Sequence, residues 1–455
     1  MAQDLIVVVP GITGSALRRG ERMLWDLSVA ALAHGLTHTT QVLQALRLPE
    51  GLGDAEPDPA DRLEPAGLIQ GWHLWPGFWA GAGYGRLLHR LRRLHPDPGR
   101  VVAFAYDWRL SNRRSARRLQ RTVETELGRW QARTGHADAK VVYLCHSMGG
   151  LVARYYLEVL GGRETARRLV TIGTPYSGSI KAVKALNGGL VPLLPWLDAQ
   201  LASVAATMPA VAQLLPTYQC VQTSSDPVTL TAAGLPSLPT AAAADAKALH
   251  SEIADAVRHN QPAPYERYAF GGRRQPTDQS VSVTPAGLLR YHRHQRGTDH
   301  AGDGTVPLFS AVAPEDATPA AGIFHAARHS GLQRLGVLLD QVTDKVNGKD
   351  LGEVLAPPVE LALDLPELAV AGTDIPVRVT ADLSDLLLHA RVHDLNGTTR
   401  EEHMPLRPDG RGAYTTILQL PPGTWHVEVE TVAVTPPARV GDVLVASPAD
   451  PARQP

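Results

Sequence analysis

The sequence predicts an α/β fold with a mostly parallel sheet, followed by a small all-β domain. Over residues 1–180, short apolar runs alternate with amphipathic segments, a pattern typical of strand–helix units that form a parallel sheet. From Pro357 onward, short strand-like runs are separated by turn signals such as Asn396-Gly397, which favours a β-sandwich. A chain of 455 residues is long enough for two such domains.

The strands expected in the first domain are continuous apolar runs, as in strands that are buried on both faces. They are Leu5–Val9, Val101–Ala105, Val141–Leu144 and Leu169–Gly173. Helices are expected at Tyr84–Leu94, Ser115–Gly135 and Gly150–Leu160. Residues 180–300 interrupt the alternation, and we expect them to form a cap over the carboxyl edge of the sheet. Residues 301–348 return to the main domain with a loop and a helix at Gly331–Val346.

The domain boundaries follow from the change from strand–helix alternation to short strand-like runs along the chain. We assign residues 1–350 to the α/β domain, with the cap insertion at about 180–300, residues 356–446 to a β-sandwich-like accessory domain, and 447–455 to a tail. The polar stretch Lys345–Gly352 contains two glycines and suits a linker, so we expect a cut there to cross few core contacts. Strands of the second domain are expected at Val359–Leu363, Ile375–Thr380, Leu387–Asp394, Thr415–Leu420 and Trp425–Val429.

Composition excludes several classes of function. A formal net charge of -1 gives no reason to expect binding to nucleic acid. The apolar run Leu5–Val9 lacks the basic start and the length of a signal peptide, and no run approaches a membrane span, so we expect a cytoplasmic protein. Two cysteines, Cys145 and Cys220, do not indicate a disulfide framework.

The segment around Ser147 is the strongest functional feature. An apolar strand runs into a sharp turn at the serine, and a helix follows, which is the G-x-S-x-G nucleophile elbow with Cys145 in place of the first glycine. The tight turn presents the serine at the top of the sheet, and the helix N-terminus directs N–H groups toward developing negative charge. This pattern predicts an α/β-hydrolase fold with Ser147 as the nucleophile; an ordinary strand–helix turn with a serine N-cap is the alternative.

A serine hydroxyl needs a base, and in this fold the chain order is serine, then acid, then histidine. The short loop Gly302–Pro307 supplies Asp303, and a later loop supplies His329 at the start of a helix. We expect Asp303 to orient the imidazole and His329 to take the serine proton. Asp299 is the rival acid and His325 the rival base.

Acyl transfer also requires an oxyanion hole. One donor is conventionally the N–H after the nucleophile, here Met148, and the tight loop after the first strand offers the Ile12 N–H as the second. The same loop lacks the Lys-Ser/Thr of a P-loop and the spacing of a dinucleotide fingerprint. We expect neither a metal nor an organic cofactor.

These motifs together resemble the lecithin:cholesterol acyltransferase family, which includes lysosomal phospholipase and the phospholipid:diacylglycerol acyltransferases. The resemblance spans residues 5–332 and rests on Val9–Gly14, Tyr106–Leu110, Cys145–Gly150, Gly173–Ile180, Gly302–Val306 and the loop ending at His329. It implies lipid esters as substrates and supports Asp303 and His329 as acid and base. Cysteines of the lid disulfide seen in secreted animal members have no counterparts here, and the β-domain lies outside the resemblance.

The predicted function is therefore serine-dependent acyl transfer on ester substrates, as a lipase or phospholipase-type hydrolase or as an O-acyltransferase. A small-ester carboxylesterase and a non-catalytic scaffold whose β-domain binds a partner are the alternatives. We expect Asp107 and Arg109 to form a structural ion pair. Met208–Tyr218 is expected to pack within the cap, or alternatively to face lipid, in which case the cap would make transient contact with a membrane surface.

Overall fold

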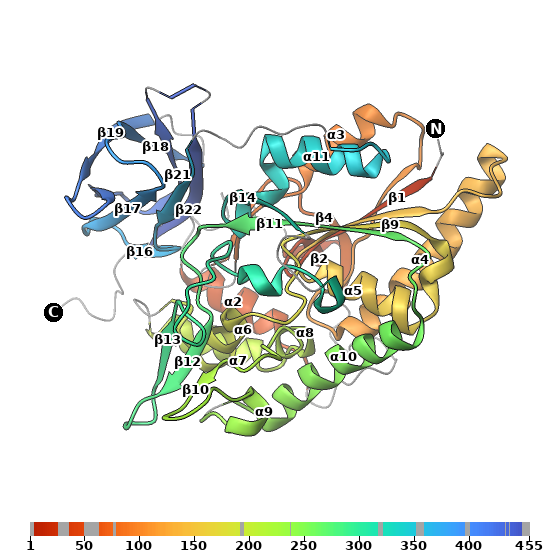
Figure 1. The fold of residues 1–455 in the computed structure, drawn as a ribbon, viewed down its shortest axis with the longest axis horizontal. Coiled ribbons are helices and arrows are strands. Elements are labelled where there is room, and N and C mark those ends of the chain that lie inside the picture. Colours follow the sequence, from red (N-terminus) through yellow and green to blue (C-terminus); the bar gives the residue numbers. More distant parts are fainter. Residues whose placement is uncertain are drawn as a thin grey trace.

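The computed structural model describes most of the chain, and Figure 1 shows its arrangement. The described residues are 4–25, 36–49, 63–75, 79–191, 195–236, 238–316, 322–351, 359–395, 401–432, 434–435 and 437–447. They form a central sheet covered by helices, a cap beside it, and a separate C-terminal β-domain (Figure 1).

The central sheet has six strands, and every neighbouring pair is parallel. In spatial order the strands are β14 (Gly322–Ala326), β11 (Glu266–Arg273), β9 (Ala166–Ile172), β8 (Val141–His146), β1 (Leu5–Val9) and β7 (Val101–Ala103). The α/β fold predicted from the sequence is confirmed, including its four expected strands.

Side chains of β1 point alternately into two hydrophobic cores, one on each face of the sheet. Ile6 and Val8 pack with α3 (Gly85–Leu94) and α11 (Gly336–Val346). Leu5 and Val7 pack in the other core, with residues of α4 (Asn112–Thr134) and α5 (Gly149–Arg154). Helices therefore cover both faces of the sheet, as the uniformly apolar strands require (Figure 1).

The cap consists of short helices and a small sheet. These are α6 (Ile180–Asn187), α7 (Pro195–Ala205), α8 (Pro209–Ala212), α9 (Leu230–Ala233), α10 (Thr240–His259), β10 (Val221–Gln222), β12 (Ser280–Val283) and β13 (Leu289–His292). The structure corrects the expected insertion of residues 180–300 at one point, because β11 lies within that range and belongs to the central sheet.

The sequence hides β11 because two glycines and charged residues interrupt its apolar pattern. Close packing explains one of these glycines: a Cβ on Gly272 would lie 2.2 Å from the carbonyl oxygen of Ala327 and 2.5 Å from Cβ of Asp303. The backbone of β11 thus touches the loops that carry the expected acid and base.

Smaller elements complete the α/β domain. They are α2 (Leu36–Leu46), β2 (Ser15–Arg19), β3 (Arg22–Trp25), β4 (Glu64–Leu68), β5 (Trp72–Trp75), β6 (Trp79–Ala82), a π-helical turn at Tyr155–Val159, and 3-10 helices at Gly162–Thr165, Leu308–Ser310, Pro314–Asp316 and His329–Arg334. The expected helix Gly150–Leu160 is thus α5 followed by the π-helical turn, and the last 3-10 helix precedes α11.

The C-terminal domain is an eight-stranded sheet that curls around its own apolar cluster. Its strands are β15 (Leu361–Asp364), β16 (Leu368–Val370), β17 (Ile375–Ala381), β18 (Leu388–Asp394), β19 (Glu401–Pro408), β20 (Ala413–Leu418), β21 (Gly423–Thr431) and β22 (Arg439–Ser447). The turn at Asn396-Gly397 and residues 448–455 of the expected tail lie outside the described residues. We propose residues 356–446 as the extent of this domain.

The two domains share a hydrophobic boundary. Leu368, Val443 and Val445 of the β-domain belong to the same apolar cluster as the core of the α/β domain. The expectation that a cut near Gly352 crosses few core contacts stays a prediction, and such a cut would uncover these three side chains. No helix within the described ranges is both long and apolar enough to cross a membrane.

Candidate active site

Ser147 occupies a strained turn between β8 and α5. Its φ is +53°, a region that residues other than glycine rarely adopt, and its N–H donates to the carbonyl of Ile172 at 2.8 Å. The turn can be this tight because small residues follow: a Cβ on Gly149 would lie 2.5 Å from the carbonyl oxygen of Pro10, and one on Gly150 would lie 2.1 Å from Oγ1 of Thr174. Strain at one serine, enforced by its neighbours, is characteristic of a functional turn.

Cys145 departs from the elbow pattern without disturbing the turn. It lies in β8, paired in register with Val9 and Thr171, and its side chain is fully buried in the main core. Burial raises the pKa of its thiol, which favours the protonated form. Both Cys145 and Cys220 are buried free thiols.

The structure brings together the three residues that the sequence singles out. His329 Nε2 lies 3.0 Å from Ser147 Oγ, and His329 Nδ1 lies 2.6 Å from Asp303 Oδ2. Relative exposures of Ser147, His329 and Asp303 are 6%, 4% and 1%. The imidazole thus lies between a hydroxyl and a carboxylate in a nearly dry setting, where electrostatic interactions are strong.

Asp303 is held so that one oxygen faces the histidine. Its Oδ1 accepts hydrogen bonds from the N–H groups of Thr305 at 2.9 Å and Val306 at 2.7 Å, which leaves Oδ2 for His329. The His329 N–H also donates to the Asp303 carbonyl at 2.7 Å. Because an ionised carboxylate only accepts, it selects the tautomer with the proton on Nδ1 and leaves Nε2 to accept the serine proton.

The rival acid and base lie elsewhere in hydrogen-bond networks of their own. Asp299 Oδ1 accepts from Gln279 Nε2 at 2.6 Å and from the Ala301 N–H at 2.7 Å. His325, on β14, has Nε2 2.7 Å from Gln341 Oε1. The geometry therefore favours Asp303 and His329.

The loop after β1 lies against the nucleophile. A Cβ on Gly11 would be 2.8 Å from Cβ of Ser147, so only a glycine allows this approach. Within the described chain, the N–H groups of Ile12 and Met148 donate no hydrogen bond to another protein group. Both amides, the two donors expected from the sequence, are thus available to a substrate oxygen.

A tyrosine that the sequence analysis missed supports this loop. Tyr84 OH accepts from the Gly11 N–H at 2.9 Å and lies 2.8 Å from His146 Nδ1, to which it can donate. Burial raises the pKa of Tyr84, so the hydroxyl keeps the proton that it donates. The His146 ring in turn lies 5.2 Å from that of His329, measured between centroids. No sequence signal marks Tyr84, since it precedes an ordinary amphipathic helix.

Asp107 and Arg109 form the ion pair that the sequence predicts. Arg109 Nε and Nη2 donate to the two carboxylate oxygens at 2.9 and 2.7 Å, and its Nη1 donates to the Leu46 carbonyl at 3.2 Å. Arg109 is fully buried. A bidentate pair with further hydrogen bonds indicates a structural role in holding this loop.

The segment Met208–Tyr218 packs inside the cap, since most of its apolar side chains, such as Val211 and Leu215, are buried in the main core. It therefore does not present the lipid-facing surface considered from the sequence. Exposed large apolar side chains of the cap occur instead at the turn between β12 and β13, where Val283 is 42% exposed and Leu288 is 68% exposed.

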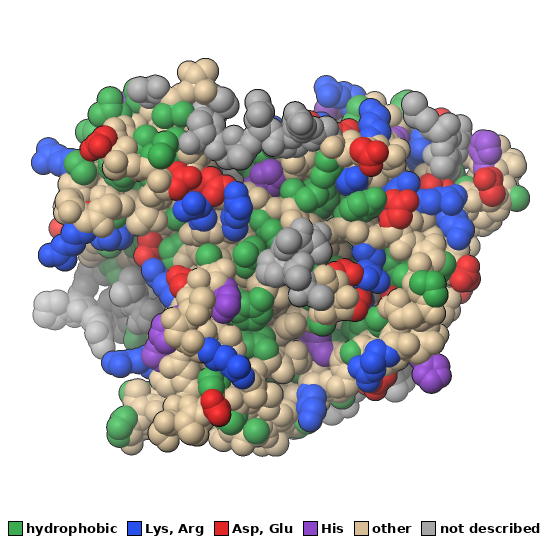
Figure 2. All heavy atoms as spheres, in the orientation of Figure 1, with side chains coloured by type: hydrophobic (Ala, Val, Ile, Leu, Met, Phe, Trp, Pro, Cys, Tyr) green, Lys and Arg blue, Asp and Glu red, His purple; other side chains and the backbone are tan. Residues whose placement is uncertain are grey.

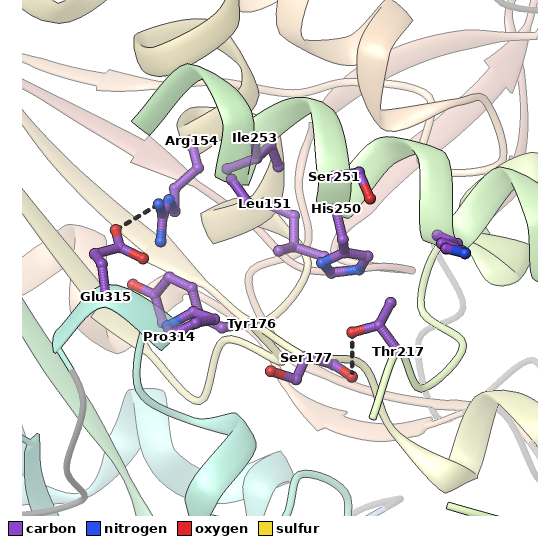
Figure 3. Close-up of a pocket in the computed structure, with 12 residues that line it drawn as sticks. Leu151, Arg154, Tyr176, Ser177, Thr217, His250, Ser251, Ile253, Pro314 and Glu315 are labelled. Atoms are coloured by element: carbon purple, nitrogen blue, oxygen red, sulfur yellow. Dashed lines mark hydrogen bonds and ion pairs between the residues drawn. The ribbon is translucent and has the colours of Figure 1, made fainter. Parts of the chain in front are cut away.

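A cavity of about 280 Å³ lies between α10 and the loop after β9. Figure 3 shows His250 facing this space, with Arg154 paired to Glu315 at one side and Thr217 bonded to Ser177 at the other. No member of the Ser147–His329–Asp303 set lines it, so it is separate from the reacting groups.

Comparison with known proteins agrees with the resemblance found in the sequence. Residues 81–250 match the family model of lecithin:cholesterol acyltransferase, which confirms the resemblance over that segment. Comparison with curated proteins gives no match.

Solved structures that are similar include a lipase of Bacillus licheniformis in its propeptide form, at 13% identity and a TM-score of 0.34, covering 97% of this chain and 73% of that one. Phospholipase PlaB of Legionella pneumophila is 9% identical with a TM-score of 0.27, covering 82% of this chain and 88% of that one. These scores are low, and the fold assignment rests on the strand order and the elbow.

Proposed function

We propose that this protein catalyses serine-dependent acyl transfer on ester substrates through a covalent acyl-enzyme. The observation that carries the proposal is the position of one imidazole, 3.0 Å from Ser147 Oγ on one side and 2.6 Å from Asp303 Oδ2 on the other. Nucleophile, base and orienting acid within hydrogen-bond reach are the signature of nucleophilic catalysis.

In the first half-reaction, Ser147 Oγ attacks the ester carbonyl while its proton passes to His329 Nε2. The negative charge on the former carbonyl oxygen is stabilised by the N–H groups of Ile12 and Met148. Collapse of this intermediate expels the alcohol, which takes the proton from His329 and leaves an acyl group on Ser147. A water or a second alcohol then attacks the acyl carbonyl while His329 accepts its proton. The bond between the acyl carbon and Ser147 Oγ breaks, the carboxylic acid or the new ester leaves, and His329 returns the proton to Ser147.

The proposed substrates are lipid esters. The family match over residues 81–250 supports an ester-acting enzyme of lipid metabolism, since lecithin and cholesterol are lipids. With water as acceptor the enzyme is a hydrolase, and with an alcohol it is an O-acyltransferase. A carboxylesterase acting on small esters is the second candidate, and a non-catalytic scaffold is disfavoured because nothing in a scaffold requires a strained serine beside an oriented histidine.

The cap offers a route to a lipid surface. The turn between β12 and β13 exposes Val283 and Leu288 beside the exposed basic residue Arg290, a combination that suits shallow contact with an anionic membrane. We include this transient contact in the proposal. The cytoplasmic location inferred from the sequence stays a prediction.

The test is reaction with a fluorophosphonate probe together with hydrolysis of short-chain and long-chain p-nitrophenyl esters. We expect Ser147→Ala to lose labelling and at least about 10³-fold of kcat, because the residue that forms the acyl bond is gone. Ser251→Ala, on the exposed side of α10, is the matched control and should behave like wild type. Wild-type turnover in Ser147→Ala, or absence of labelling in the native protein, would contradict the proposal.

A further inference from the structure

The residues on either side of His329 contact the C-terminal β-domain. Arg328 Nε lies 2.5 Å from Asp442 Oδ2, and Ser330 Oγ donates to Asp442 Oδ1 at 2.7 Å. Asp442 lies on β22, in a different domain from the histidine. One carboxylate thus binds both neighbours of the residue that faces Ser147.

This contact is largely shielded from water. Asp442 is 5% exposed, and the side chain of Arg328 is 12% exposed. Arg328 Nη1 also donates to the carbonyls of Leu363 at 3.2 Å and Leu365 at 3.4 Å, both in the β-domain. A charge pair with several hydrogen bonds at low exposure is geometrically far more restrictive than a surface ion pair.

The loop that carries the acid is fastened to the same domain. The Gln275 side chain donates from Nε2 to the Leu361 carbonyl and accepts from the Leu363 N–H, both at 3.1 Å, so it pairs with β15 as a strand backbone would. Its own N–H donates to the carbonyl of Gly302, the residue before Asp303, at 2.9 Å. Gln275 is 1% exposed.

Further charge pairs cross the same border. Glu360 pairs with Arg273 and Arg274, and Lys181 Nζ lies 2.6 Å from Glu367. Figure 2 shows acidic and basic side chains where the β-domain meets the α/β domain. These pairs also link the two domains, but none of them involves a neighbour of the histidine.

We propose that the β-domain positions the base and the acid of the active site, and that Asp442 is the positioning residue for His329. The inference rests on the proposed function. His329 begins a short 3-10 helix, whose own hydrogen bonds have poorer geometry than those of an α-helix. Side-chain contacts at Arg328 and Ser330 therefore fix the orientation of the imidazole, which must hold within a fraction of an ångström for proton transfer.

The experiment compares Asp442→Ala, Asp442→Asn and Glu430→Ala in the full chain. Glu430 is the matched control: like Asp442 it is a shielded acid of the β-domain that forms an ion pair, but its partners, Arg391 and Arg439, belong to the β-domain and do not neighbour the histidine. We expect both alanine variants to lower Tm. Asp442→Ala alone should also lower kcat by about 10- to 100-fold with KM nearly unchanged.

Two further readouts separate positioning from a general loss of stability. Fluorophosphonate labelling of Ser147 should slow in parallel with kcat, because both need an oriented base. Asp442→Asn should keep more activity than Asp442→Ala, since its amide oxygen still accepts from Ser330. Adding Ser330→Ala to Asp442→Ala should change kcat little further, because the two side chains share one contact.

Equal kcat in Asp442→Ala and Glu430→Ala would overturn the inference, as would a rise in KM at constant kcat. If Asp442→Ala does not fold, Asp442→Asn and Ser330→Ala decide the question by the same comparison. Failure of the proposed function is a different result, namely no Ser147-dependent turnover in the wild-type chain.

Discussion

The substitution Asp303→Asn separates the structural and the chemical contributions of this side chain. The amide oxygen of the variant can still accept from the N–H groups of Thr305 and Val306, which in the native chain bind Oδ1 at 2.9 and 2.7 Å. The NH₂ group then replaces Oδ2 and points at His329 Nδ1, where a carboxylate oxygen lies at 2.6 Å in the native chain. A donor facing a donor is unfavourable, so the imidazole moves its proton to Nε2 and can no longer accept from Ser147.

We expect this change to lower kcat by about 10⁴-fold, the loss seen when a triad histidine is held in the wrong tautomer, which corresponds to about 5.4 kcal/mol of transition-state stabilisation. Tm should change little because the loop keeps its backbone hydrogen bonds. The assay is hydrolysis of a soluble p-nitrophenyl ester, with Asp299→Asn as the matched control. Activity within about tenfold of wild type in Asp303→Asn, or its loss in Asp299→Asn, would refute the assignment of the acid.

Two other predictions concern pH and lipid contact. Burial lowers the pKa of His250 from 6.5 to about 4, so the free energy of unfolding is highest above pH 6.5 and falls as the pH drops toward 4, by at most about 2 kcal/mol at pH 5 from this residue. Thermal unfolding at pH 8 and pH 5 should therefore show a smaller acid-induced fall in Tm for His250→Gln than for wild type. An equal fall in the two proteins contradicts this prediction. Leu288→Asp should weaken binding to anionic phospholipid vesicles in a sedimentation assay without changing hydrolysis of soluble esters. Leu387→Asp, at a similarly exposed leucine of the β-domain, is the control and should leave vesicle binding unchanged. Equal effects of the two substitutions on vesicle binding would remove the β12–β13 turn from the proposal.

Local patterns were sufficient to predict the elbow. The turn at Ser147 is encoded within a short stretch of sequence, where an apolar strand, small residues and a helix follow one another. Asp303 and His329 were predictable for a different reason: the chain order of the fold limits where an acid and a base can lie, although only the structure separates them from Asp299 and His325.

Strands β11 and β14 were missed because their packing partners are distant in the chain. Both strands contain glycines at crowded positions, where Gly272 faces the Ala327 carbonyl and Gly322 faces the Phe324 ring, and glycine lowers the strand signal in any local pattern. Contacts such as Asp442 with Ser330 join residues 112 positions apart, and neither residue belongs to a motif. Such contacts depend on how the two domains pack against each other. The hydrophobic pattern within the sequence of either domain does not encode that packing.

The attachment of the histidine loop to β22 also has a consequence in time. The nucleophile and the Pro10–Gly14 loop belong to the early part of the chain, and domains generally fold as units, N-terminal first during synthesis. Asp442 lies in the last strand of the described chain, so a ribosome makes it long after Ser147. If the β-domain positions the base as proposed, a nascent chain would display its serine before the base is fully oriented, and its reactivity would rise once the second domain has docked.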